Sequence, residues 1–258
     1  MHTYKWLAIE NSTEILSLAI ASTQGDTSEV WTNTSEGGAK SSQLALPEIV
    51  RLMEQAHTGF TDLTAIVFGK GPGSFTGLRT ACSVAQGLAF GAGLPVLPID
   101  TLLAVAEDAR YQIAQLHMQQ TQQVNLPEEA QRFFVAMDAR MDQVYTAAYE
   151  WRSAWQCVQT PSVSSPENIC IPIEWNELAF TTVGNASDLF ASRWPKALSV
   201  KYMYAMPTAQ ALLRLSPVAF EQGLAVPPEE ALPLYIRDKV AQTTLEREQL
   251  KLATTIST

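Results

Sequence analysis

The sequence has 258 residues, of which 47% are hydrophobic, so the chain is long enough for one large domain or for two lobes with separate cores. Its formal net charge is -9. Affinity for nucleic acid depends largely on cations that neutralise phosphates, so this charge argues against a protein that holds nucleic acid by itself.

The cysteines and the N-terminal residues favour a cytoplasmic protein. Cys82, Cys157 and Cys170 are an odd number without C-x-x-C spacing, which argues against a disulfide framework or a zinc knuckle. Residues 1–14 contain a single lysine and a short apolar stretch, so we do not expect a signal peptide. Residues 81–99 are interrupted by a glutamine, glycines and two prolines, so we expect no membrane span and no membrane partner.

The first part of the chain predicts an α/β lobe. Three strands are expected at residues 4–10, 15–22 and 28–33, followed by an amphipathic helix at 41–57 with Ser41 or Ser42 as its N-cap. A buried strand at 65–68, a glycine loop with a helix after it, and a strand at 95–99 complete this unit. Such an order favours a three-layer arrangement of helices and sheet.

The glycine loop joins the strand at 65–68 to a helix. Glycines free the backbone, Pro72 fixes one φ, and Ser74 or Thr76 is able to cap the helix. A strand, a glycine loop and a helix N-terminus together make a place where an anion could sit. The candidate residues are Gly69, Gly71, Pro72, Gly73, Ser74, Phe75, Thr76, Gly77 and Arg79.

Known phosphate-binding motifs fit this loop poorly. A Walker A loop needs Lys-Ser/Thr after its second glycine, which is missing here. In the dinucleotide fingerprint Thr76 would replace the third glycine, Pro72 would stiffen the turn, and Asp100 would lie late for a ribose contact. We therefore prefer a tight structural turn over a nucleotide site.

The helix after the loop carries two stripes of small residues. Small side chains at a four-residue spacing allow another backbone to come close, either the chain's own sheet or a partner subunit. Glycine inside a helix costs about 1 kcal/mol relative to alanine, so some contact must favour it. Both interpretations stay open, and one stripe could serve each. The stripes are Ala81, Ala85 and Ala89, and Ser83, Gly87 and Gly91.

The second half of the chain predicts another lobe. After a helix at 102–118, the glutamine-rich stretch 119–131 is the expected linker between lobes at 1–118 and 132–238, with a polar tail at 239–258. Strands at 133–137 and 144–149 form a hairpin, and a helix is expected at 208–220. Asp138 and Asp142 in the hairpin turn could act as a carboxylate pair, but an ion cluster within the turn is the preferred interpretation.

Residues 69–96, GKGPGSFTGLRTACSVAQGLAFGAGLPV, closely resemble the signature of the TsaB (YeaZ-like) proteins, a family of non-catalytic subunits of the bacterial machinery that puts threonylcarbamoyl on adenosine 37 of tRNA. DARMDQVYTAAY at 138–149 and the proline-rich segment 226–238 resemble two further motifs of that family. The resemblance implies a two-lobed α/β fold of the actin/Hsp70-like (ASKHA) ATPase superfamily, with ribonuclease H-like lobes and a degenerate nucleotide site.

The resemblance also implies partners. Such a subunit would dimerise with the catalytic subunit TsaD, help to recruit TsaE, reach tRNAs that read ANN codons only through the complex, and form a homodimer when alone. We expect it to bind no cofactor, with ATP and metal in the partner subunits. The expected interface lies on the helix at 41–57 and on the helix after the loop. Its candidate residues are Leu46, Ile49, Val50, Met53, Ala81, Ser83, Ala85, Gly87, Ala89 and Gly91.

Three positions depart from the family pattern. Glu10 stands where aspartate is usual, Ser41 where histidine is frequent, and Asp142 where glycine is usual. The turn at 10–13 also lacks the glycine that lets the backbone approach phosphate in the ATPase superfamily. We therefore expect phosphate to be kept out. Arg237, in the last motif, could be functional, but an ordinary surface ion-pair residue is the preferred interpretation.

No catalytic or metal-ligating set is evident. His2, His57 and His117 lie far apart, no G-x-S-x-G motif occurs, and Cys82 lies among small apolar residues. The preferred hypothesis is a catalytically silent scaffold. Two alternatives stay open: a nucleotide-dependent enzyme or glycoprotease-like peptidase that uses the loop at 69–77, and a self-assembling protein of the actin type.

Overall fold

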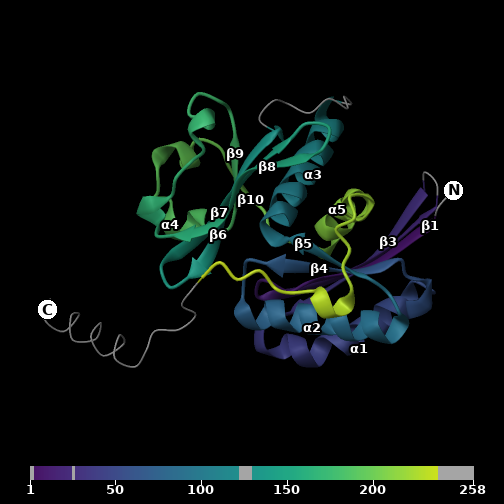
Figure 1. Cartoon of the computed structure of the whole chain (residues 1–258). Coiled ribbons are helices and arrows are strands. Elements are labelled where there is room, and N and C mark those ends of the chain that lie inside the picture. Colours follow the sequence, from purple (N-terminus) through teal and green to yellow (C-terminus); the bar gives the residue numbers. More distant parts are fainter. Residues whose placement is uncertain (1–2, 25–26, 122–129, 238–258) are drawn as a thin grey trace, which may run out of the picture.

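The computed structural model describes residues 3–24, 27–121 and 130–237 and shows two lobes, each built on a five-stranded sheet (Figure 1). The first sheet has the order β3-β2-β1-β4-β5, in which β1, β2 and β3 are antiparallel and β4 and β5 run parallel to β1. Its strands are β1 (Thr3–Glu10), β2 (Ile15–Gln24), β3 (Thr27–Glu36), β4 (Ala65–Gly71) and β5 (Val96–Asp100). The predicted strands are confirmed, and β2 and β3 extend beyond their predicted ends.

Helices cover both faces of this sheet (Figure 1). α1 (Ser41–Gln55) and α2 (Phe75–Ala92) pack on one face, together with Leu7 and Ile9 of β1. α5 (Ala209–Glu221) packs on the other face, where Trp6 and Ala8 of β1 point. Because successive side chains of a strand point to opposite faces, a central strand must be apolar where it is covered on both sides, as β1 is from Trp6 to Ile9.

The second sheet has the order β10-β9-β6-β7-β8. α3 (Thr101–Thr121) covers one face, and α4 (Ser187–Phe190) and short 3-10 turns cover the other. Trp175 and Trp194 are buried in that second layer. The strands are β6 (Arg132–Arg140), β7 (Gln143–Trp151), β8 (Trp155–Ser164), β9 (Thr181–Gly184) and β10 (Tyr202–Tyr204).

Two helices pack in the other lobe from the one that the sequence predicts. α3, predicted within the first lobe, packs on the second sheet, whereas α5, predicted within the second lobe, packs on the first. The segment after α5 stays on the first lobe, where Val226 pairs with Val96, and then reaches the β6–β7 turn (Figure 1). The boundaries at 118 and 132 are therefore wrong for these two helices, because a local polar stretch does not reveal which sheet a helix packs against.

Ser74 is the N-cap of α2, as predicted, because its side chain accepts from the Gly77 N–H at 3.4 Å. The N-cap prediction for the first helix is wrong. Lys40 occupies that position without a side-chain bond, and Ser41 instead donates to the carbonyl of Gly38. Within the described ranges, no helix has the length and apolar character needed to cross a bilayer.

Candidate functional site

A cleft of about 580 Å³ lies between the lobes and contains part of the glycine loop. Residues 12–15 of the β1–β2 turn and 72–76 of the loop line it from the first lobe, and residues 137–141 at the β6–β7 turn line it from the second. Residues 234–237, after α5, line it as well. Ligands bind preferentially in such clefts between lobes, so we first ask what this one could hold.

Two glycines of the loop make room for the chain's own β1–β2 turn. A side chain at Gly77 would collide with the backbone carbonyl of Asn11. A Cβ at Gly73 would lie 2.5 Å from the Cβ of Ser12, closer than real Cβ contacts. The space that these glycines create is therefore filled by residues 11–12, not left open to a ligand.

The other two glycines are enclosed in the same way. Gly69 faces the carboxyl group of Glu10 so closely that no side chain fits there. Gly71 has a φ of +114°, which glycine adopts easily, and its Cβ would lie 2.8 Å from the carbonyl oxygen of Leu234. All four glycines of the loop thus serve close packing within this chain.

Hydrogen bonds fix the β1–β2 turn against both helices. The backbone N–H of Ser74 donates to the carbonyl of Ser12 at 2.7 Å. The side-chain amide of Asn11 donates to the Oγ of Ser41 at 3.0 Å and to the carbonyl of Gly77 at 3.1 Å. An amide at the start of α2, of the kind that would face an anion, is therefore already engaged.

Glu10 is the acidic residue of this turn, and its side chain is completely enclosed. Its Oε1 accepts from the backbone N–H of Ser12 at 2.7 Å. Burial raises the pKa of the carboxyl, although hydrogen bonds from Ser12 act in the opposite direction. A carboxylate that approached phosphate or a hydrated cation would need to face the cleft, and this one faces Gly69.

Asp100, a weak candidate for a ribose contact, has a structural role. Its Oδ1 accepts from the backbone N–H groups of Leu102 and Leu103 at 2.8 and 3.4 Å, at the start of α3. Its Oδ2 accepts from the hydroxyl of Tyr149 at 2.9 Å. Burial raises the pKa of this carboxyl as well. Both oxygens are occupied, so the residue holds α3 on the second sheet.

The two carboxylates of the β6–β7 turn are each held by arginine. Arg140 lies between Asp138 at 3.5 Å and Glu14 of the first lobe at 2.5 Å. Asp142 pairs with Arg193 at 2.6 Å, and that pairing lowers the pKa of its carboxyl. An ion cluster is therefore the correct interpretation. Arg140 belongs to the turn itself, whereas Glu14 and Arg193 come from outside it. Within the described residues, no three His, Cys, Asp or Glu side chains are placed to hold a metal ion.

Among the described residues, Arg237 has no carboxylate partner, so the ion pair preferred from the sequence is not found there. Its guanidinium donates to the carbonyl of Ala139 at 2.8 Å and to the Oε1 of Gln143 at 2.7 Å, both at the β6–β7 turn. Arg79 of α2 also contacts the segment after α5, at Tyr235. It stacks on Phe75 at 3.7 Å and donates to the hydroxyl of Tyr235 at 3.0 Å. Both arginines hold the segment after α5 in place.

These contacts show that the loop does not fit a nucleotide phosphate. A phosphate needs free amides and a backbone that it can approach closely. Here the close approach belongs to Asn11 and Ser12, and Arg140, which lines the cleft, is paired with Glu14 of the β1–β2 turn. The remaining cleft is bounded mainly by the two hairpin turns and the segment after α5.

Comparisons with known proteins agree with this architecture. The family model described as TsaD, tRNA N6-adenosine threonylcarbamoyltransferase, matches residues 36–245. The tRNA threonylcarbamoyladenosine biosynthesis protein TsaB of Haemophilus influenzae is 30% identical over 253 residues, which cover 93% of this chain and 96% of that protein. TsaB of Escherichia coli is 30% identical over 207 residues, covering 77% of this chain and 81% of that protein.

The chain belongs to the TsaB (YeaZ-like) family. A solved structure of YeaZ from Pseudomonas aeruginosa is 29% identical, has a TM-score of 0.73, and aligns over 90% of this chain and 99% of that one. The two-lobed α/β fold predicted from the family resemblance is therefore confirmed.

The predicted interface residues of this family member fall into two groups. Five are buried in the core of the first lobe and are not available to a partner in this structure, which corrects their assignment. Alanines pack on the sheet because they allow α2 to approach it closely. The buried residues are Ile49, Met53, Ala81, Ala85 and Ala89.

The other five lie on the outer face of α1 and α2. Leu46 and Val50 are 47% and 46% exposed. Ser83 is exposed, and a Cβ at Gly87 or Gly91 would meet no atom of the described residues within 4 Å. Packing among the residues that the structure describes thus does not explain the second stripe.

Sequence reasoning missed three participants. Asn11 and Ser12 fill the glycine loop. In the sequence, only Gly73 and Gly77 indicate that another segment packs closely against this loop. Phe90 is 80% exposed, and it lies three residues beyond Gly87 and therefore on nearly the same face of α2. Its helical spacing could have revealed it.

Proposed function

We propose that this chain is a non-catalytic scaffold subunit of tRNA threonylcarbamoyladenosine biosynthesis in the cytoplasm. It acts by dimerising with the catalytic subunit TsaD and by helping to recruit TsaE, and the assembly transfers threonylcarbamoyl to adenosine 37 of tRNAs that read ANN codons. The names of the relatives support this pathway, because several are called tRNA threonylcarbamoyladenosine biosynthesis protein TsaB.

The proposal that the chain is non-catalytic is supported mainly by the glycine loop, which is filled by the chain's own residues. Asn11 and Ser12 take the space beside Gly73 and Gly77 in which a phosphate would have to lie. Glu10 points to Gly69 and is buried, so it is not available to a metal-bound phosphate in the cleft. ATP and metal therefore belong to the partner subunits in this proposal.

The outer face of α1 and α2 supports a subunit role. Large apolar side chains are exposed on these helices at Leu46, Val50 and Phe90. Gly87 and Gly91 have no side chains, so another helix could approach the backbone of α2 closely there. Glycine in a helix reduces stability, so two glycines that touch nothing within the chain favour a function in close helix contact with another subunit. Without TsaD, the same face could pair two copies of this chain.

The experiment is to mix the purified chain with TsaD from the same organism. Light scattering measures association, calorimetry measures ATP binding to the chain alone, and an assay of threonylcarbamoyladenosine formation compares TsaD with and without it. We expect a defined heteromer, no ATP binding by this chain alone, and tRNA modification only when both subunits are present.

Other outcomes would point elsewhere. Tight ATP binding without association would contradict the scaffold and favour a nucleotide-dependent enzyme. Cleavage of a peptide by the chain alone would favour the peptidase alternative. Filaments that grow with concentration would indicate a self-assembling protein.

A further inference from the structure

α3 and α5 form the contact between the lobes on the side away from the cleft turns. The buried face of α3, with Val105, Ala106 and Ala109, packs on the second sheet. The buried face of α5, with Leu212 and Leu215, packs on the first. α3 therefore packs mainly on the second sheet and α5 on the first, while Ala104 of α3 also joins the core of the first lobe. Opening or closing of the cleft would have to change the contact between these two helices.

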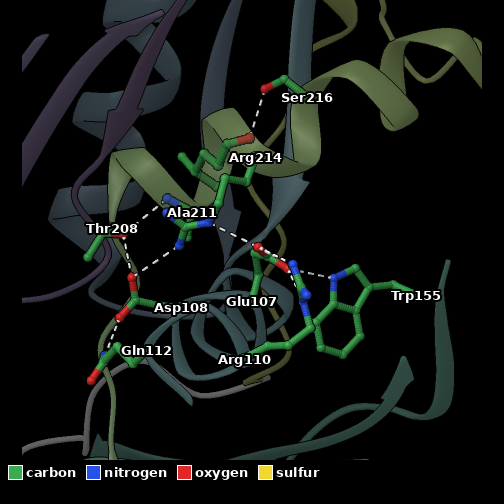
Figure 2. A network of polar contacts seen from close by, with 10 residues as sticks. Glu107, Asp108, Arg110, Gln112, Trp155, Thr208, Ala211, Arg214 and Ser216 are labelled. Atoms are coloured by element: carbon green, nitrogen blue, oxygen red, sulfur yellow. Dashed lines mark hydrogen bonds and ion pairs between the residues drawn. The ribbon is translucent and has the colours of Figure 1, made fainter. Parts of the chain in front are cut away.

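A buried polar network joins these two helices (Figure 2). Glu107 of α3 accepts from Arg110 on its own helix at 2.9 Å, from Arg214 of α5 at 2.9 Å, and from the indole N–H of Trp155 on β8 at 3.0 Å. Its neighbour Asp108 accepts from Thr208, the N-cap of α5, at 3.1 Å. Two adjacent carboxylates of α3 therefore contact α5 of the first lobe and β8 of the second.

The network allows little movement because its central charge is buried. The side chain of Glu107 is only 2% exposed, so water cannot replace a donor that moves away. The arginines are also confined, since Arg214 stacks on Tyr111 at 4.2 Å and Arg110 stacks on Trp151 at 4.3 Å. Sliding α5 along α3 would break several of these contacts at once.

The cleft side carries a second connection. Arg237, at the end of the segment that leaves α5, donates to the β6–β7 turn of the second lobe. The same segment is held to the first lobe, where the N–H of Leu234 donates to the carbonyl of Lys70 at 2.6 Å and Gln86 donates to the carbonyl of Ala231 at 3.0 Å. The lobes are thus connected on opposite sides of the contact.

We infer that the two lobes form one rigid unit whose cleft has a fixed opening, held by the Glu107 network on one side and by the Arg237 segment on the other. Hinge closure around a ligand is a common motion of two-lobed proteins, and it requires a contact that can slide. This chain has instead a set of hydrogen bonds centred on the buried carboxylate of Glu107. The two turns that line the cleft are then held at one separation whatever ligand is present. This inference does not depend on the proposed function.

The test is a distance measurement between the lobes in the full chain by pulsed electron paramagnetic resonance. Spin labels are attached through Arg51→Cys on α1 and Glu177→Cys in the second lobe, both exposed, after the exposed cysteines are removed by Cys157→Ser and Cys170→Ser. We expect one narrow distance distribution that does not shift when ATP with Mg²⁺ is added.

Variants then locate the restraint. Arg214→Met, which removes the α5 side of the network, should at least double the width of the distribution, and adding Arg237→Ala should widen it further. The matched control is Arg193→Ala, which breaks ion pairs with Asp142 and Glu167 inside the second lobe and should leave the width unchanged. Circular dichroism checks that each variant is folded.

The inference is overturned if the unmodified chain gives a broad or two-peaked distribution, or if ATP with Mg²⁺ shifts it. It is also overturned if folded Arg214→Met combined with Arg237→Ala stays as narrow as the Arg193→Ala control. Because the first result needs no network variant, a variant that fails to fold does not prevent a decision.

Discussion

Glu10 ends β1 with a fully buried carboxyl group, at a position where its charge is poorly accommodated. Burial raises the pKa above its ordinary value of 4.5, so the folded state binds this proton more tightly than the unfolded state does. The stabilising contribution is therefore complete below the unfolded pKa and is lost as pH rises through the folded pKa. The buried charge therefore destabilises the β1–β2 turn, which fills the glycine loop.

We therefore predict that Glu10→Gln stabilises the protein at neutral pH and flattens this part of its pH dependence. The amide retains the acceptor for the N–H of Ser12 but never becomes charged. Urea unfolding of both proteins between pH 4.5 and 8 measures the difference, which should grow with pH. A constant difference would show that Glu10 does not titrate differently in the folded state.

Gly77 and Gly87 lie in the same helix but in opposite environments, so they form a matched pair. Gly77→Ala places a methyl group on the carbonyl of Asn11 and should cost about 1–3 kcal/mol of unfolding free energy. Gly87→Ala meets no neighbour and should instead gain about 0.5–1 kcal/mol. Chemical denaturation measures both values. Equal effects would mean that the β1–β2 turn does not fill the loop.

At the scale of the element, α2 shows what the sequence could and could not predict. The start of the helix after the glycine loop, Ser74 as one of two candidate N-caps, and the small residues along it follow from local pattern. Which stripe faces the sheet does not, because Ala85 and Gly87 differ too little in hydrophobicity to mark an inside and an outside. The glycine loop likewise shows that room is needed, without showing that Asn11 and Ser12 occupy it.

α5 illustrates a second limit. Its amphipathic pattern predicts a helix with one buried face, and the helix is confirmed. Nothing in that pattern says which sheet the face meets, so the helix was placed in the wrong lobe. The contact between Arg214 and Glu107 could not be predicted either, because the two residues lie 107 positions apart and no local pattern links them.

The outer face of α2 gives a prediction for association. Gly87→Trp should leave the chain folded, because the position is open, but should weaken binding to TsaD at least tenfold, about 1.4 kcal/mol, by holding the helices apart. Ala85→Trp is the contrasting variant, because Ala85 is fully buried and overpacking there should lower stability before it affects binding. Thermal melts and light scattering with TsaD separate the two effects. Unchanged association of folded Gly87→Trp would remove α2 from the interface.

For the whole molecule, the net charge of -9 limits how tRNA can be held. Each phosphate neutralised by a protein cation contributes a slope of about -0.7 to -0.9 to the logarithm of affinity against the logarithm of salt concentration. In the described lining of the cleft, Arg140 is paired with Glu14 and Arg237 donates to the β6–β7 turn. We therefore expect this acidic subunit to add nothing to that slope, even if it raises the activity of the assembly.

We predict that this chain alone does not bind tRNA at physiological salt, and that tRNA affinity falls with salt equally steeply for TsaD and for its complex with this chain. Fluorescence anisotropy with labelled tRNA over a salt series measures both slopes. A complex whose slope is steeper by about 1 or more would reveal at least one additional phosphate contact. Since the partner's cations are the same in both samples, that contact would have to come either from this acidic chain or from a rearrangement that it imposes on TsaD. The Gly87→Trp variant is the control for both sources, because each requires association and the mixture of a non-associating variant with TsaD must return to the slope of TsaD.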